Sequence, residues 1–381
     1  MSEFQIYQFK SIDRPLTDAE RKEIGSWSTR TNPTATSATF TYAYGDFPKD
    51  EEKAVEKYFD AMLYAANWGT KRLIFRLPKD QVDAEALSAY LFENEASMDT
   101  IMLKECKSCY LLDIHFSNEE GGTWLSEDDY SVDDLAPLRD NIIEGDYRAL
   151  YLVWLQFAQY ATFEDEEDEG MTEHVPPPVP ANLSKLSAPL NAFIEFFEID
   201  EDIVAAAEVT SPVQETAAPG YETLIAQLPE KERNEWLLRL VNAEPHLELA
   251  FKKRLQQLAP PRKAAPSVSL SLMEINALVR TKAAARLEQA AEAARLAHIQ
   301  RMEQLARDET ALWKSVDENL LKATSKSYDE AVMTLKNLFE LAVYEHMESS
   351  FKEKISALKA QYVRKVGSSS PLFAHIALLR H

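Results

Sequence analysis

The sequence predicts an α+β (or α/β) N-terminal domain followed by α-helical segments and a C-terminal long-helix bundle or coiled-coil-like hairpin. The first 120 residues alternate strand patterns with helix patterns, as in a small mixed domain. Residues 273–321 contain neither Pro nor Gly and repeat apolar side chains every three to five positions. Two proline-rich breaks lie between these regions, and 381 residues exceed the usual size of one hydrophobic core.

The N-terminal domain begins with residues 4–9, where apolar and polar side chains alternate as in a half-buried strand. Thr17 and Glu20 have the spacing of a capping box, so a helix is expected from there to about Trp27. Gly69 is expected to supply the left-handed turn that ends a later helix. The expected elements, in order, are strand 4–9, helix 17–27, strand 36–44, helix 50–66, strand 73–77, helix 84–92 and a hairpin formed by 100–105 and 110–116.

Composition divides the rest of the chain. Residues 164–169 are six consecutive acidic residues, and the proline-rich run 175–180 follows, so an extended linker is expected here. The long C-terminal helix is expected to pack on two shorter ones over 328–344 and 347–363. The predicted parts are a mixed α/β domain over 1–120, a helical extension packed on it over 121–162, an acidic and proline-rich linker over 163–183, a small helical region over 184–258, a linker over 259–271, a long helical bundle over 272–366 and a tail over 367–381.

Charge is distributed unevenly along the chain. The net charge is −22, yet residues 259–381 carry 18 Lys and Arg against 14 Asp and Glu. Residues 1–258 carry 23 basic residues against 49 acidic ones. The two parts are therefore expected to have different partners.

The composition argues against several classes of function. Only 9 glycines occur, and no G-x-G-x-x-G, G-x-x-x-x-G-K-[ST] or G-x-S-x-G motif is present, so nucleotide enzymes and a nucleophile elbow are unsupported. In the C-terminal helix the arginines alternate with acidic residues, which indicates a salt-bridged surface rather than a nucleic-acid interface. No apolar run is long enough to span a bilayer and the N-terminus lacks the pattern of a signal peptide, so we expect a cytoplasmic protein without membrane contact.

The two cysteines form the motif Cys106-Lys-Ser-Cys109, which could be a redox couple or half of a zinc site. There is no second C-x-x-C motif, and His115, the nearby histidine, falls within an expected strand. The pair is expected at a hairpin turn, whereas a thioredoxin-type couple begins a helix. We therefore favour two reduced thiols, and predict neither a metal nor a cofactor.

The least implausible catalytic residues are Asp113, His115 and Arg72, with Asn67 and Trp68 nearby. Asp113 and His115 are alternate residues of an expected strand, so they share one face. The same spacing is found on any exposed strand, and the acidic runs are expected to be solvated because mobile carboxylates cannot hold the geometry of a general acid. The sequence therefore assigns no catalytic residue.

The long C-terminal helix offers a candidate interaction surface. Its apolar stripe is broader than an isolated helix can bury, so the helix must pack on its neighbours or on another chain. The stripe consists of Leu287, Ala291, Ala294, Leu305 and Trp313. The alternative is a bundle that buries the stripe within one chain.

Four motifs resemble an uncharacterised family of bacterial conserved hypothetical proteins: IDRPLT at 12–17, YFDA at 58–61, ANWGTKRL at 66–73 and LSAPL at 186–190. The resemblance implies no activity. The segment SYDEAV at 327–332, with the leucines that follow it, is similar to the helical tail of bacterial SWIM zinc-finger proteins. The zinc-binding C-x-C and C-x-H pattern of those proteins is absent, so this resemblance implies only a related helical packing module.

Three functional hypotheses follow. The leading one is a non-enzymatic adaptor or scaffold that binds a protein partner, with self-association through the C-terminal helices as an option. The second is an enzyme of unrecognised type with a site in the N-terminal domain. The third is an acidic regulator or decoy of a basic partner.

Overall fold

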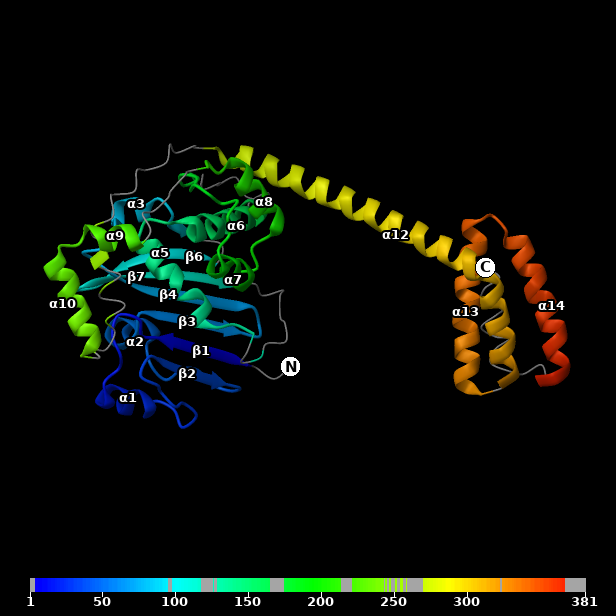
Figure 1. Cartoon of the computed structure of the whole chain (residues 1–381), viewed down its shortest axis with the longest axis horizontal. Coiled ribbons are helices and arrows are strands. Elements are labelled where there is room, and N and C mark those ends of the chain that lie inside the picture. Colours follow the sequence, from blue (N-terminus) through cyan, green and yellow to red (C-terminus); the bar gives the residue numbers. More distant parts are fainter. Residues whose placement is uncertain are drawn as a thin grey trace. The chain divides into compact units, whose positions relative to one another are not determined.

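A seven-stranded antiparallel sheet with the strand order β2-β1-β3-β4-β7-β6-β5 forms the centre of the N-terminal part in the computed structural model (Figure 1). The structure describes residues 4–94, 98–117, 126, 129–164, 175–213, 221–242, 270–322 and 324–366, and the single residues 244, 247, 251, 254, 255 and 258. The strands are β1 (Gln5–Lys10), β2 (Ser37–Tyr42), β3 (Ala61–Ala66), β4 (Thr70–Pro78), β5 (Phe92–Glu93), β6 (Thr100–Glu105) and β7 (Cys109–Ser117).

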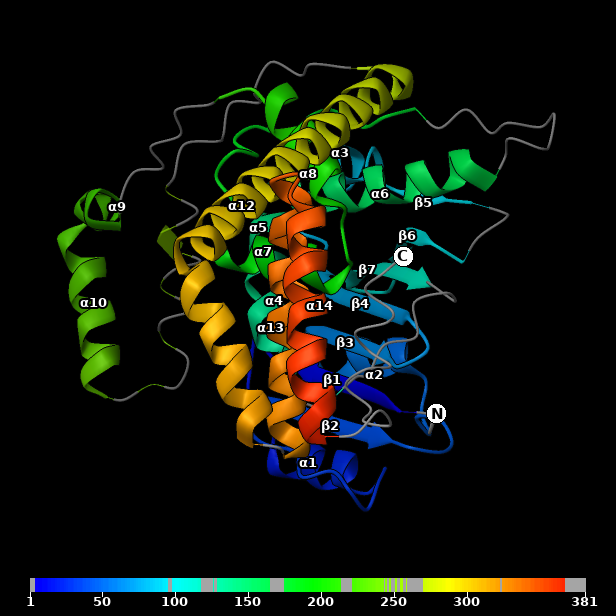
Figure 2. The same ribbon diagram turned by 90° about the vertical axis from the view of Figure 1, so that its right-hand side faces the viewer.

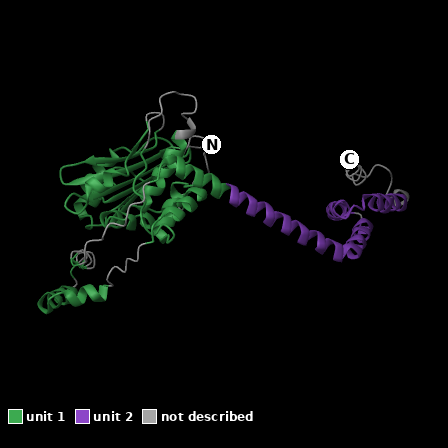
Figure 3. Ribbon diagram, turned by 90° about the horizontal axis from the view of Figure 1, so that it is seen from above, with its two compact units in different colours: residues 1–283 green, residues 284–381 purple. Residues whose placement is uncertain are grey.

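The chain divides into two compact units, residues 1–283 and residues 284–381 (Figure 3). The first unit contains the sheet and most of the shorter helices. Its helices are α1 (Asp18–Gly25), α2 (Glu51–Tyr58), α3 (Ala84–Ser88), α4 (Val132–Leu135), α5 (Pro137–Ile143), α6 (Arg148–Glu164), α7 (Ala188–Phe196), α8 (Glu201–Thr210), α9 (Tyr221–Gln227) and α10 (Glu230–Val241). An α+β architecture followed by helical segments is therefore confirmed.

One face of the sheet is covered by α4, α5 and α6, and α7 and α8 pack on these helices. Leu63, Leu73, Phe75 and Ile114 point to this face and are fully buried. Helix α6 is apolar around most of its circumference, because it lies between the sheet and the helices α7 and α8. The sequence analysis expected the linker 163–183 to separate domains. In the structure, α7 and α8, which follow this range, pack on the same hydrophobic core as the sheet.

The other face of the sheet packs on α1 and α2. Tyr7, Phe9, Met62 and Ile74 point to this side and form a second core. The rings of Tyr7, Phe9 and neighbouring aromatic residues lie with their centroids 4.5 to 6.3 Å apart. The predicted capping box of α1 is confirmed, because the Thr17 hydroxyl accepts a hydrogen bond from the Glu20 amide and the Glu20 carboxylate accepts one from the Thr17 amide.

Two of the family-like motifs meet at a buried ion network. Asp60, which is 1% exposed, accepts hydrogen bonds from the backbone amides of Ile12 and Asp13 at 2.6 and 2.8 Å. Arg76 pairs with the Asp60 carboxylate, and the buried Arg139 donates to Asp13 at 2.7 Å. The network therefore fixes the loop after β1 against β4 and α5.

Residues 50–66 are not one helix, as the sequence analysis expected. Helix α2 ends at Tyr58, Phe59 is extended, and β3 follows. Gly69, with φ of 99°, closes the turn between β3 and β4 instead of ending a helix, and its amide donates to the Ala66 carbonyl at 3.0 Å. The expected helix over 84–92 is also shorter, because α3 ends at Ser88 and Phe92 belongs to β5.

The second unit is built from the later part of α12 (Leu272–Lys322) with α13 (Ser325–Tyr344) and α14 (Glu348–Val366). Helix α13 packs on α14, and apolar side chains from the last part of α12 complete their core (Figure 2). Val316, Leu335, Leu338 and Phe351 are among the buried residues of their common core. The predicted C-terminal long-helix bundle is thus present.

Three expectations fall on residues outside the described part: most of the acidic run 164–169, the break at 259–266 and the tail 367–381. Among the described residues, no helix combines the length and the apolar character needed to cross a bilayer.

Candidate functional site

Residues 284–298 of α12, which we call the open segment, have all their side chains exposed. Leu287 is 62% exposed and Leu296 is 47% exposed. Exposure of such large apolar side chains to water is unfavourable. The same helix packs into the bundle farther along the chain. Leu287 and Leu296 are nine positions apart and lie on opposite sides of the helix, so each side exposes one large apolar side chain.

The open segment is helical because of its local sequence. Seven of its residues are alanine, which has the highest helix propensity and loses no side-chain entropy. Arg295 also donates two hydrogen bonds to the Glu292 carboxylate, at 2.7 and 2.8 Å. The open segment can therefore remain helical without a partner chain.

The apolar face of the open segment continues into the core of the bundle. Leu287, Ala291 and Ala294 are three or four positions apart and share one face of α12. Leu305, eleven positions after Ala294, continues this face and is half-buried, and Val316, eleven positions farther, is fully buried. One stripe is therefore covered at its C-terminal end and uncovered at its N-terminal end.

The structure divides the predicted interaction residues. Leu305 is half-buried, and Trp313 packs on Phe351 of α14 with ring centroids 5.7 Å apart. Lys354 of α14 lies 5.3 Å from the Trp313 ring centroid. Leu287, Ala291 and Ala294 remain on the exposed face.

The two flanks of the exposed stripe differ. On one flank lie Glu288 and Arg295, seven positions apart, and on the other lie Ala290 and Ala297. One flank therefore has one charge of each sign and the other has only small side chains. This asymmetry limits the ways in which a second helix can pack on the segment.

The candidate catalytic residues lie together on the sheet, where Arg72 of β4 stands opposite His115 of β7 in the register. Arg72 binds Asp113 through two nitrogens, with contacts of 2.5 to 3.2 Å, and Glu52 at 3.2 Å. The His115 Nδ1 lies 2.8 Å from the Met98 carbonyl oxygen. The prediction that Asp113 and His115 share a face is confirmed.

Arg72 and Asp113 neutralise each other. Burial alone would lower the pKa of Arg72, but the hydrogen bonds and charge of Asp113 outweigh that effect and raise it. Asp113 is 4% exposed, and Arg72 donates hydrogen bonds to both of its carboxylate oxygens. This geometry ties α2 to the sheet and provides no free general base.

The C-x-x-C motif is at a hairpin turn, as predicted. Cys106 follows β6 and Cys109 begins β7, and the Cys106 amide donates to the Cys109 carbonyl at 3.0 Å. Burial raises the pKa of Cys106 to about 11 and also raises that of Cys109. Glu56, on α2, was not anticipated by the sequence analysis: its carboxylate and the two sulfurs lie within 4.8 Å of one another.

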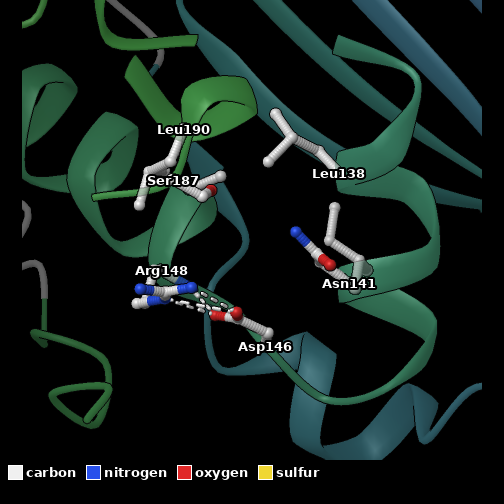
Figure 4. Close-up of a pocket in the computed structure, with 8 residues that line it drawn as sticks. Leu138, Asn141, Asp146, Arg148, Ser187 and Leu190 are labelled. Carbon is white, nitrogen blue, oxygen red and sulfur yellow. Dashed lines mark hydrogen bonds and ion pairs between the residues drawn. The ribbon is translucent and has the colours of Figure 1, made fainter. Parts of the chain in front are cut away.

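A small cavity lies between α5, the start of α6 and the start of α7 (Figure 4). Its volume is about 10 Å³, which corresponds to one water molecule. Asp146 and Arg148 form a bidentate pair at its wall, and the buried Ser187 hydroxyl has no hydrogen-bond partner among the described residues. This cavity is a place for a structural water and is too small for a substrate.

No family model, curated protein or solved structure matches the chain.

Proposed function

We propose that the protein is a non-enzymatic cytoplasmic adaptor or scaffold that acts through protein–protein interaction, by the pairing of helices along the open segment. One observation supports this proposal most strongly: the apolar stripe that builds the bundle core continues into the open segment, where Leu287, Ala291 and Ala294 are exposed. An apolar stripe on a preformed helix is the surface that helix-pairing partners use.

The charge pattern favours a second copy of the same chain as the partner, in antiparallel orientation. If Ala291 packs opposite Ala294 of the second copy, then Glu288 faces Arg295 of that copy. The twofold axis repeats the pair, so both charged residues of each chain are matched. The alanines allow the two helix axes to come close, near the lower end of the usual range of about 8–10 Å.

Parallel pairing offers no such match. In a parallel pair, the flank of one helix that carries Glu288 and Arg295 faces the alanine flank of the other helix. Arg295 would then lie opposite Ala290 of the second chain. The charges would then gain no partner from the second chain. The antiparallel arrangement is the one that we propose.

The interaction should be weak and reversible. The open segment is roughly 20 Å long, since a helix rises about 1.5 Å per residue, and it is only one helix wide. A contact of this kind falls below the roughly 1,200 Å² that is usual for stable complexes. We therefore expect association at micromolar or higher concentrations.

Sedimentation equilibrium of the full chain over a wide concentration range tests the proposal. We expect reversible self-association, and we expect Ala291→Glu to abolish it because the twofold pair would then bury two carboxylates at its apolar centre. Gln289→Glu, on the opposite face of the same exposed segment, adds the same charge and should leave association unchanged. Monomeric behaviour of the unaltered chain at every concentration, or equal effects of the two variants, would contradict the proposal.

A further inference from the structure

The two cysteines and a carboxylate from another element lie close enough to bind one metal ion. The hairpin between β6 and β7 brings the side chains of Cys106 and Cys109 together. Helix α2 packs across the same end of these strands and adds the carboxylate of Glu56. The three ligand atoms lie within 4.8 Å of one another.

These separations suit a tetrahedral thiophilic ion. Zinc binds sulfur at about 2.3 Å and carboxylate oxygen at about 2.0–2.2 Å, which places neighbouring ligand atoms about 3.5–3.8 Å apart. Reaching that spacing requires only rotation of exposed or half-exposed side chains, since Glu56 is exposed and Cys106 is partly exposed. Cys109 is 1% exposed and supplies the fixed ligand.

Glu56 differs from the other acidic residues of its helix. Glu51 and Glu52 form ion pairs with Arg72, and Glu52 also pairs with Lys104. Among the described residues, by contrast, no hydrogen bond or ion pair engages the Glu56 carboxylate. It is the carboxylate of α2 that is available to a ligand.

We propose that Cys106, Cys109 and Glu56 form a mononuclear site for a thiophilic divalent cation, with zinc as the expected metal. Three protein ligands leave one tetrahedral position for water or an added ligand. The ion would crosslink α2 to the β6–β7 hairpin. This proposal is independent of helix pairing by the open segment, because all three ligands belong to the first unit.

Cobalt(II) provides a direct probe, because Cys106 and Cys109 are the only cysteines in the chain. The full chain is first reduced and freed of metal, and then titrated with cobalt(II) and afterwards with zinc(II). We expect one equivalent of cobalt to produce a sulfur-to-cobalt charge-transfer band and the intense visible bands of tetrahedral cobalt. Zinc should remove both sets of bands by displacement.

Two variants test proposed ligands, and a third is the control. Cys106→Ser should remove most of the charge-transfer intensity, and Glu56→Gln should weaken cobalt binding by about tenfold or more. Glu105→Gln is the matched control, because it removes an exposed carboxylate next to Cys106 that lies outside the cluster, and it should bind like the unaltered protein. Circular dichroism shows whether each variant is folded.

Several results would overturn the proposal. One is the absence of a charge-transfer band in the reduced protein. Another is equal cobalt affinity of the Glu56→Gln and Glu105→Gln variants, which would show that Glu56 is not a ligand. A third is formation of a disulfide between the two cysteines even when the metal is present, which would indicate a redox role for the pair.

Discussion

At the scale of single residues, Asp60 is a buried carboxylate at the centre of an ion network. It is buried and binds two backbone amides and Arg76, and Arg139 lies 3.9 Å away. Removing one member of a buried ion network leaves the others desolvated and unmatched. We therefore expect Asp60→Asn to lower the free energy of unfolding by about 3 kcal/mol or more.

Urea unfolding followed by circular dichroism measures this effect. Asp18→Asn is the matched control, since the Asp18 side chain is 94% exposed and pairs with Arg21 at the surface. Asp18→Asn should lower the free energy of unfolding by no more than about 1 kcal/mol. Equal costs for the two variants would show that the buried network contributes little.

Glu20 should make a small contribution to stability that depends on pH. The Arg14 side chain and the Thr17 backbone amide hold its pKa at about 2, below the ordinary value of 4.5. Because the folded state lowers this pKa, the contribution is present above the ordinary value and is lost as the pH falls toward 2. The pair is partly exposed, so the effect should be below about 1 kcal/mol.

The comparison of Glu20→Gln with the unaltered chain isolates this contribution. We expect the variant to be less stable near neutral pH and the difference to shrink at about pH 2–3, where Glu20 itself becomes protonated. Urea unfolding at the two pH values is the measurement. A difference that does not change with pH would rule out the Glu20 ionisation as its cause.

At the scale of elements, the turn between β3 and β4 depends on Gly69. Its φ of 99° lies in the left-handed region, where a Cβ atom is strained. Gly69→Ala should therefore lower the free energy of unfolding by about 1–2 kcal/mol. Gly25→Ala is the control, because Gly25 ends α1 without a positive φ and its added Cβ would lie 3.6 Å from Pro33, an ordinary contact.

Thermal unfolding of the two glycine variants checks the assignment of this turn. Gly25→Ala should be neutral or slightly stabilising, since alanine reduces the entropy of the unfolded chain. If Gly69→Ala were equally harmless, the hairpin turn would not have the backbone conformation described above.

The elements that could be predicted are those with an unambiguous local signal. The alternating pattern of β1, the capping box of α1 and the β6–β7 hairpin were identified from the sequence. Residues 61–66 were not, because β3 is buried on both faces and reads as a continuous apolar run. Such a run cannot be distinguished from a buried helix by periodicity.

The candidate sites were predictable only in part, for a related reason. The apolar stripe of α12 is visible in the sequence, but which portion α13 and α14 cover depends on how the bundle packs. The cysteine pair is likewise visible, but its neighbour Glu56 lies 50 residues before Cys106 and comes near it only through the packing of α2 on the sheet. Contacts between distant segments have no local signal.

For the whole molecule, the central claim is that antiparallel pairing of the open segment joins two copies of the chain. A charge-swap experiment in the analytical ultracentrifuge tests it most directly. Glu288→Arg should weaken self-association, because two arginines would face each other, and the double variant Glu288→Arg with Arg295→Glu should restore it. Failure of the double variant to recover, or association of the single variant as strong as that of the unaltered chain, would contradict the account.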